Sequence, residues 1–173
     1  MNSVSIVSSG ITELETDAIV NAANSSLLQG GGVCGVIFRA AGSAQLQQAC
    51  DAIGHCPTGS AVITPAFHIR SAKYIIHAVG PVWSGGAHHE AELLYSAYQS
   101  ALELALQNGC ASIGFPLISS GIYGYPLEGA WEEALKACND FFNAHPGCSL
   151  KVRFGVPDAG KRSAGLEALR RYS

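Results

Sequence analysis

The most informative stretch of the sequence is Asp17-Ala-Ile-Val-Asn-Ala-Ala-Asn-Ser-Ser-Leu-Leu-Gln-Gly-Gly-Gly32. Residues 17–22 are mostly apolar, which is typical of a strand buried on both faces of a sheet. Residues 24–32 form a polar loop that ends in three glycines, and residues 33–52 have a helical pattern that breaks near Gly42. Because glycines leave backbone N–H groups unobstructed and the next helix adds the positive end of its dipole, this stretch predicts an anion-binding loop.

A second loop of the same kind follows another buried strand. The strand is expected at residues 111–118, and the loop runs Ser119-Ser-Gly-Ile-Tyr-Gly-Tyr125 before Pro126 leads into a helix. In sheets with parallel strands, ligands bind where loops leave the carboxyl ends of the strands. Two such loops therefore predict two adjacent anion sites, as a diphosphate would need. Tyr123 and Tyr125 either cover a sugar or pack within the loop.

The rest of the chain alternates strands with helices. Strands are expected at residues 3–7, 60–64, 73–79 and 149–156, and helices at residues 89–107, 127–144 and 161–171. No repeat, linker or low-complexity segment divides residues 1–173. The pattern therefore predicts a single α/β domain with three layers, α/β/α, around a largely parallel sheet.

Composition excludes several classes of protein. Hydrophobic residues make up 48% of the chain and charged residues 13%, which is incompatible with disorder. No segment reaches the roughly 18 uninterrupted apolar residues of a membrane-spanning helix. The first 38 residues contain no Lys or Arg. A secretory or transit peptide would carry basic residues there. We therefore expect a cytoplasmic protein without membrane contact.

The net charge of −3 is unevenly distributed along the chain. Residues 1–150 carry four basic and eleven acidic groups, a formal −7, whereas residues 151–173 carry six basic and two acidic groups, a formal +4. A basic end could contact a polyanion. Because no aromatic residues are interleaved with these charges, we interpret residues 151–173 as ending in a solvated helix and expect no nucleic-acid partner.

The cysteines and glycines suggest disulfides, a zinc site and a nicotinamide cofactor, none of which we expect. Six cysteines are expected to be reduced, mostly core residues in a cytosolic chain. The cluster Cys50, His55 and Cys56 lacks the paired short spacings of a zinc site, so we expect no metal ion. Gly30-x-Gly32-x-x-Gly35 matches a dinucleotide-binding fingerprint, but about seven residues separate it from the strand, so we expect no nicotinamide cofactor.

Seven motifs together resemble one known family. They are Gly10-Ile-Thr-Glu-Leu14, Asp17-Ala-Ile-Val-Asn-Ala-Ala-Asn24, Gly30-Gly-Gly-Val33, Arg39-Ala-Ala-Gly42, Cys56-Pro-Thr-Gly59, Ile75-Ile-His-Ala-Val-Gly-Pro81 and Ser119-Ser-Gly-Ile-Tyr-Gly-Tyr-Pro126. In this order they resemble the macrodomains, the ADP-ribose-binding fold, and most closely its bacterial MacroD-type branch. The resemblance implies a mixed sheet of six or seven strands between helices, with ADP-ribose bound in a cleft at the strand ends.

The resemblance also implies roles for individual residues. Ile11 would meet the adenine through its backbone, Asn24 would contact the distal ribose, and the two glycine loops would surround the diphosphate. The implied ligand-binding residues are Gly10, Ile11, Ala22, Asn24, Gly30, Gly31, Gly32, Val33, Ser119, Ser120, Gly121, Ile122 and Tyr123. The implied catalytic residues are Asn24, Cys34 and Tyr123, with no metal ion or cofactor.

The chain departs from the family pattern at the base pocket and at the catalytic loop. Gly10 stands where the family usually has an Asp that accepts a hydrogen bond from the adenine amino group. Cys34 and Phe38 stand where active MacroD-type members have Asp and His. Val156 lies near the position where an aromatic residue often stacks on adenine. The diphosphate and distal-ribose motifs are intact.

Three functional hypotheses follow. Alphaviral macrodomains, which the chain resembles at Gly32-Val33-Cys34, hydrolyse ADP-ribosyl bonds through a positioned water, and positioning supplies much of rate acceleration. The first hypothesis is thus a hydrolase that removes mono-ADP-ribose from acidic side chains or deacetylates O-acetyl-ADP-ribose. The second is a non-catalytic reader of ADP-ribose or a related nucleotide. Both imply ADP-ribose or an ADP-ribosylated protein as partner, and we expect a monomer.

The third hypothesis is a cysteine enzyme. Cys34 lies at a helix N-terminus, a position that favours the thiolate. Its one plausible partner in the motifs is His77, which falls within an apolar strand and is better interpreted as a core histidine with satisfied hydrogen bonds.

Overall fold

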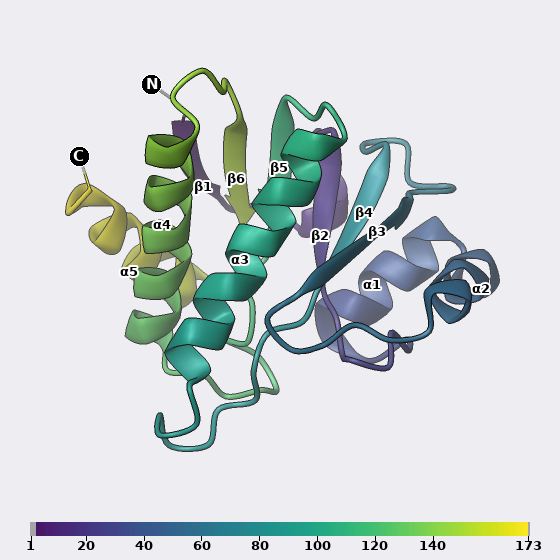
Figure 1. The fold of residues 1–173 in the computed structure, drawn as a ribbon, viewed down its shortest axis with the longest axis horizontal. Coiled ribbons are helices and arrows are strands. Elements are labelled where there is room, and N and C mark those ends of the chain that lie inside the picture. Colours follow the sequence, from purple (N-terminus) through teal and green to yellow (C-terminus); the bar gives the residue numbers. More distant parts are fainter. Residues whose placement is uncertain (1–2, 173) are drawn as a thin grey trace.

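Six strands form one mixed sheet at the centre of residues 3–172, the part of the chain described by this computed structural model (Figure 1). The strands are β1 (Ser3–Val7), β2 (Ala18–Ala22), β3 (Ala61–Pro65), β4 (Tyr74–Ala78), β5 (Ser112–Phe115) and β6 (Lys151–Gly155). Their order in the sheet is β1-β6-β5-β2-β4-β3. β3 runs antiparallel to β4, and every other neighbouring pair is parallel. The expected largely parallel sheet is confirmed.

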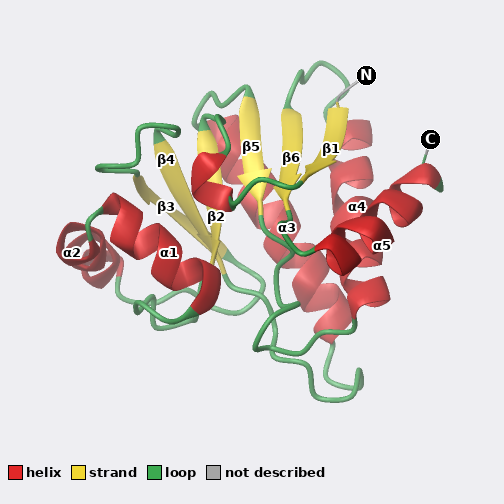
Figure 2. Ribbon diagram, turned by 180° about the vertical axis from the view of Figure 1, so that it is seen from behind, coloured by secondary structure: helices red, strands yellow, loops and turns green. Residues whose placement is uncertain are grey.

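Helices cover both faces of the sheet, which gives the three layers expected from the sequence (Figure 2). They are α1 (Gly32–Ala41), α2 (Ser43–Ile53), α3 (Glu90–Gln107), α4 (Leu127–Ala144) and α5 (Ala159–Arg170), with a short 3-10 helix, η1 (Ile11–Glu13). α3 and α4 lie on one face and α1 and α2 on the other. α5 packs against α4 near β1. None of the helices within residues 3–172 is long and apolar enough to cross a membrane.

Strand β2 is buried on both faces, as its apolar sequence predicted. Ala18 and Val20 pack in the core beneath α3 and α4, whereas Ile19 packs in the core beneath α1 and α2. All three side chains are completely buried. Consecutive residues of a strand point to opposite faces, so two hydrophobic layers hold this strand in place and fix the loop that follows it.

Several element ends differ from the sequence-based expectation for local reasons. The strand expected at residues 111–118 ends at Phe115, because Pro116 has no N–H to continue the ladder. The last helix begins at Ala159 rather than at residue 161, since the Asp158 side chain accepts a hydrogen bond from the Lys161 N–H at 2.9 Å and caps it. Gly42 separates α1 from α2 with a φ of 101°, a conformation that favours glycine.

Candidate functional site

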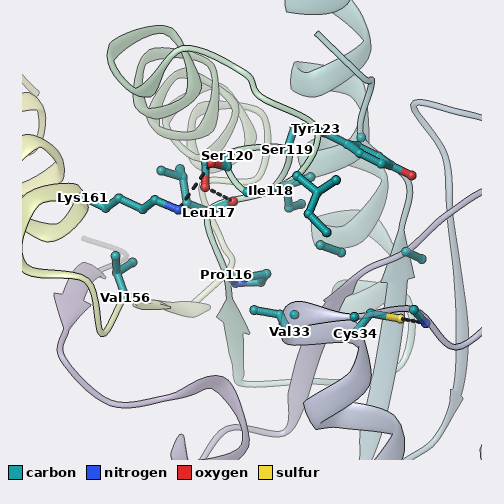
Figure 3. A pocket seen from close by; sticks show the side chains of 18 of the residues that line it. Val33, Cys34, Pro116, Leu117, Ile118, Ser119, Ser120, Tyr123, Val156 and Lys161 are labelled. Atoms are coloured by element: carbon teal, nitrogen blue, oxygen red, sulfur yellow. Dashed lines mark hydrogen bonds between the residues drawn. The ribbon is translucent and has the colours of Figure 1, made fainter.

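A cavity of about 360 Å³ lies at the carboxyl ends of strands β2, β4, β5 and β6 (Figure 3). This edge of an open α/β sheet is where such folds bind ligands. Each strand leads into a segment of its wall. The wall is formed by residues 22–24, 30–34, Gly80, 116–123, 155–158 and Lys161.

The cavity brings together most of the residues that the sequence analysis singled out. The lining includes Cys34 and every predicted ligand-binding residue except Gly10 and Ile11. Gly80, residues 116–118, residues 155–158 and Lys161 also line it. Of these residues, the sequence motifs point only to Val156, as a position near the adenine. Strand order brings β4 and β6, and with them Gly80 and residues 155–158, to the site.

The first glycine loop leaves the N-terminus of α1 open. No side chain caps this helix, whose first turn begins at Gly32, so its leading N–H groups have no partner within the helix. A Cβ atom added to Gly30, Gly31 or Gly32 would meet no heavy atom within 4 Å. Gly32 has a φ of +56°, in the left-handed region. Unobstructed N–H groups at a helix N-terminus form an anion site.

Two side chains hold this loop in shape. The Asn24 amide donates from Nδ2 to the Leu28 carbonyl at 2.8 Å and accepts at Oδ1 from the Leu28 N–H at 3.0 Å. The Cys34 thiol accepts from the Gly30 N–H at 3.4 Å and donates to the Leu28 carbonyl at 3.8 Å. An amide has a second N–H and a second lone pair, so Asn24 retains donor and acceptor capacity for a ligand.

The second glycine loop is compact and closely packed against the end of β4. Ser119 has a φ of +67°, which non-glycine residues rarely adopt. Its carbonyl accepts from the Tyr125 N–H at 2.9 Å, and the Gly121 carbonyl accepts from the Gly124 N–H at 3.0 Å. Beyond these bonds Ile122 is 92% exposed, so the tip of the loop faces solvent.

A buried carboxylate braces the second loop from outside the cavity. Glu90, 1% exposed, accepts hydrogen bonds from the N–H groups of Ser84, Gly86 and His88 at 2.8, 2.9 and 2.6 Å. The segment that it holds begins after Trp83, whose N–H donates to the Tyr123 carbonyl at 2.8 Å. The Trp83 ring also packs edge-on against Tyr125, with ring centroids 4.8 Å apart.

Glu90 should make stability depend on pH in the acid range. Burial raises the pKa of this carboxyl, but the hydrogen bonds from Gly86, Ser84 and His88 outweigh burial and lower the pKa from 4.5 to about 2. A depressed folded-state pKa contributes stability above the unfolded value, and this stability is lost as the pH falls through the folded value. The Tm advantage of wild type over Glu90→Gln should therefore be largest above pH 4.5 and shrink toward pH 2.

The measurement is thermal denaturation across this pH range. Glu167→Gln, which changes an exposed carboxylate of α5 that forms no ion pair within residues 3–172, is the control and should show little pH-dependent difference. A Tm difference between wild type and Glu90→Gln that stays constant with pH would contradict this account.

His77 is a core histidine, as predicted, and it does not contact Cys34. It is completely buried. Asn21 Nδ2 donates to its Nδ1 at 3.0 Å, and its Nε2 lies 3.0 Å from the Thr64 hydroxyl and 3.9 Å from Cys50 Sγ. Burial lowers the pKa of His77 to about 4. Because both of its ring nitrogens are engaged in the core, His77 does not serve as a base for a Cys34 nucleophile.

Gly10 and Ile11 are not part of the cavity wall and lie next to the hydrophobic core beneath α1 and α2. Ile11 is 4% exposed and belongs to the same hydrophobic cluster as Phe38. The Gly10 N–H donates to Glu13 Oε1 at 3.1 Å, and a Cβ at position 10 would lie 2.9 Å from that oxygen. Position 10 itself carries no carboxylate, but the Glu13 carboxylate lies next to it.

Comparisons with known proteins agree with this architecture. The Macro domain family model matches residues 20–134. An O-acetyl-ADP-ribose deacetylase of Salmonella gallinarum is 55% identical over 144 residues, which cover 81% of this chain and 79% of that protein. A macrodomain of Oceanobacillus iheyensis, solved with ADP, has a TM-score of 0.92 at 38% identity and covers 99% of this chain and 92% of its own.

A further solved structure is a macrodomain of Trypanosoma brucei in complex with ADP-ribose. Its TM-score is 0.88 at 36% identity, and the match covers 96% of this chain and 68% of that one. Sequence and fold thus lead to the same family that the motifs resembled. This chain belongs to the macro domain family.

Proposed function

We propose that this chain binds ADP-ribose in the cavity and hydrolyses esters of its distal ribose. The substrates would be O-acetyl-ADP-ribose and proteins that carry mono-ADP-ribose on acidic side chains. The observation that carries the proposal is that two glycine loops from separate strands line one cavity. The relative from Salmonella gallinarum bears the name O-acetyl-ADP-ribose deacetylase, which supports the same chemistry.

The two loops have complementary tasks in this proposal. The open N-terminus of α1 and the backbone of Ser119–Tyr123 would bind the diphosphate through N–H groups. Asn24 would orient the distal ribose with the N–H and the lone pair that its bonds to Leu28 leave unused. Tyr123, at the edge of the cavity, would limit the movement of that sugar (Figure 3).

Hydrolysis would proceed without a carboxylate base from the first loop. Asp158 is the carboxylate among the described lining residues, and its side chain caps α5. A water held between the loops would attack the anomeric carbon of the distal ribose, form a new C–O bond there and pass its proton to a phosphate oxygen of the substrate. The bond from that carbon to the ester oxygen would break, and the acid would leave as a carboxylate. Without a general base, which contributes about 10²–10⁴-fold, turnover should be slow.

Replacing Asn24 or Tyr123 by alanine should lower turnover about tenfold, because each change loosens the orientation of the ribose. The measurement is release of ADP-ribose from O-acetyl-ADP-ribose and from a Glu-modified protein. Asn143→Ala and Tyr172→Ala, on residues outside the cavity lining, are matched controls that should keep wild-type rates. Unchanged turnover in both site variants would place the chemistry elsewhere.

The second candidate is a reader that binds ADP-ribose without turnover. Cys34 favours this alternative, since its thiol is bonded to Gly30 and Leu28 and supplies no carboxylate. Wild-type protein that binds ADP-ribose but releases none from either substrate would establish the reader. In either case we propose one domain that acts as a monomer in the cytoplasm on ADP-ribosylated partners, and gel filtration tests the monomer.

A further inference from the structure

Among the cavity-lining residues in the described range, 3–172, Lys161 is the one with a basic side chain. It belongs to the basic segment that the sequence analysis interpreted as solvated. Its Nζ donates a hydrogen bond, at 3.3 Å, to the carbonyl of Ser120, a residue of the second glycine loop. Figure 3 shows the side chain extending from α5 toward Ser120.

The backbone of Lys161 is fixed from two sides. Its N–H donates to the capping Asp158 side chain at 2.9 Å, and its carbonyl accepts from Trp131 Nε1 at 2.9 Å. One turn further, Gly165 lies so close to the Trp131 ring that an added Cβ would be 2.5 Å from it. This close approach locks α5 onto α4. A pre-positioned side chain loses less conformational entropy when a ligand binds.

The ammonium group of Lys161 has hydrogen-bond donors and a charge for which the described residues provide only one partner. No carboxylate within residues 3–172 forms an ion pair with it. An ammonium has three donors, and the Ser120 carbonyl takes one of them. Because Lys161 lines the cavity beside the second glycine loop, its positive charge and remaining donors are available to an anion bound there.

The order of the strands says which part of a ligand this charge would meet. Strand β5, with the second glycine loop at its end, lies between β2 and β6. Asn24 and Cys34 lie on the β2 side of the cavity, whereas Val156, Asp158 and Lys161 lie on the β6 side. With the distal ribose on the β2 side, the adenosine half of the ligand lies on the β6 side.

We propose that Lys161 binds the adenosine-side phosphate of ADP-ribose. It acts as a specificity-determining residue that selects phosphorylated adenosine over adenosine itself. This inference rests on the proposed function, because it takes the orientation of ADP-ribose in the cavity from it.

The test compares three ligands on four proteins. ADP-ribose, AMP and adenosine are titrated by NMR into wild type, Lys161→Met, Lys161→Arg and Arg170→Met. Met keeps the length of the side chain without its charge, Arg keeps the charge, and Arg170→Met removes the same charge from the far end of α5. We expect Lys161→Met to lower the affinity for ADP-ribose and for AMP about tenfold each, which is the scale of a charge-assisted hydrogen bond. The affinity for adenosine should not change.

The control variants sharpen this outcome. Lys161→Arg should retain most of the affinity and Arg170→Met all of it. A loss with ADP-ribose but not with AMP would place Lys161 at the other phosphate and overturn the proposal. Equal losses with all three ligands would show a structural role, and no loss at all would also overturn it. Failure of wild type to bind ADP-ribose would instead overturn the proposed function.

Discussion

Replacing Gly121 by glutamate is expected to abolish ADP-ribose binding. A Cβ atom at this position meets no heavy atom within 4 Å, so the folded protein has room for the larger side chain. The new carboxylate would stand on the wall of the cavity where the diphosphate is proposed to bind. Two like charges about 4 Å apart repel by about 4 kcal/mol near a protein surface, which corresponds to about a thousandfold in affinity.

Isothermal titration calorimetry with ADP-ribose measures this loss. Gly147→Glu is the matched control, because its Cβ is equally unobstructed and its loop, between α4 and β6, lies outside the cavity. It adds the same charge and should leave the affinity within about twofold, since surface charges beyond about 10 Å are screened by salt. A Gly121→Glu variant that binds like wild type would exclude the second loop as a phosphate site.

Adding a single methyl group at Gly80 should also disturb binding strongly. A Cβ at Gly80 would overlap Ser119 Oγ and would lie 2.6 Å from Cγ2 of Ile118. Ile118 is β-branched and almost completely buried, so it has little freedom to move aside. The second loop must then shift, and overpacking of this kind costs about 1–3 kcal/mol.

If the loop absorbs this strain, Gly80→Ala should lower the affinity for ADP-ribose by up to about a hundredfold. Calorimetry gives the affinity, and denaturant unfolding shows how much of the strain appears as lost stability. Gly147→Ala, which adds a methyl into open space, should change neither quantity by much. Wild-type affinity in Gly80→Ala would show that Ser119 rotates without moving the loop.

Both glycine loops could be predicted from sequence because their signals are local. Gly30–Gly32 follow a strand and precede a helix within one short segment, and Ser119–Tyr125 repeat this arrangement. Glycine spacing and the apolar pattern of the preceding strand are enough to predict both the loops and the edge of the sheet where they meet. Their resemblance to one family then added the ligand.

The other walls of the cavity could not be predicted, because long-range packing creates them. Lys161 reaches the site with its backbone held partly by Trp131, on another helix, which donates to the Lys161 carbonyl at 2.9 Å. Arg170 is exposed, as a solvated final helix predicts, whereas the half-buried Lys161 also lines the cavity. The contact of Glu13 with Gly10 is instead local, because η1 folds the Glu13 side chain back onto the Gly10 N–H.

The position of β1 has a consequence for how the chain folds during synthesis. This strand lies at the edge of the sheet, and its neighbour is β6, so Ser3 pairs with Lys151. Because β1 is synthesised well before β6, its backbone groups find their partners only after β6 has been made. Contacts so distant in sequence slow folding. Until β6 emerges, β1 remains an unpaired strand that other chains can capture, so chaperone binding to nascent chains should concentrate on it.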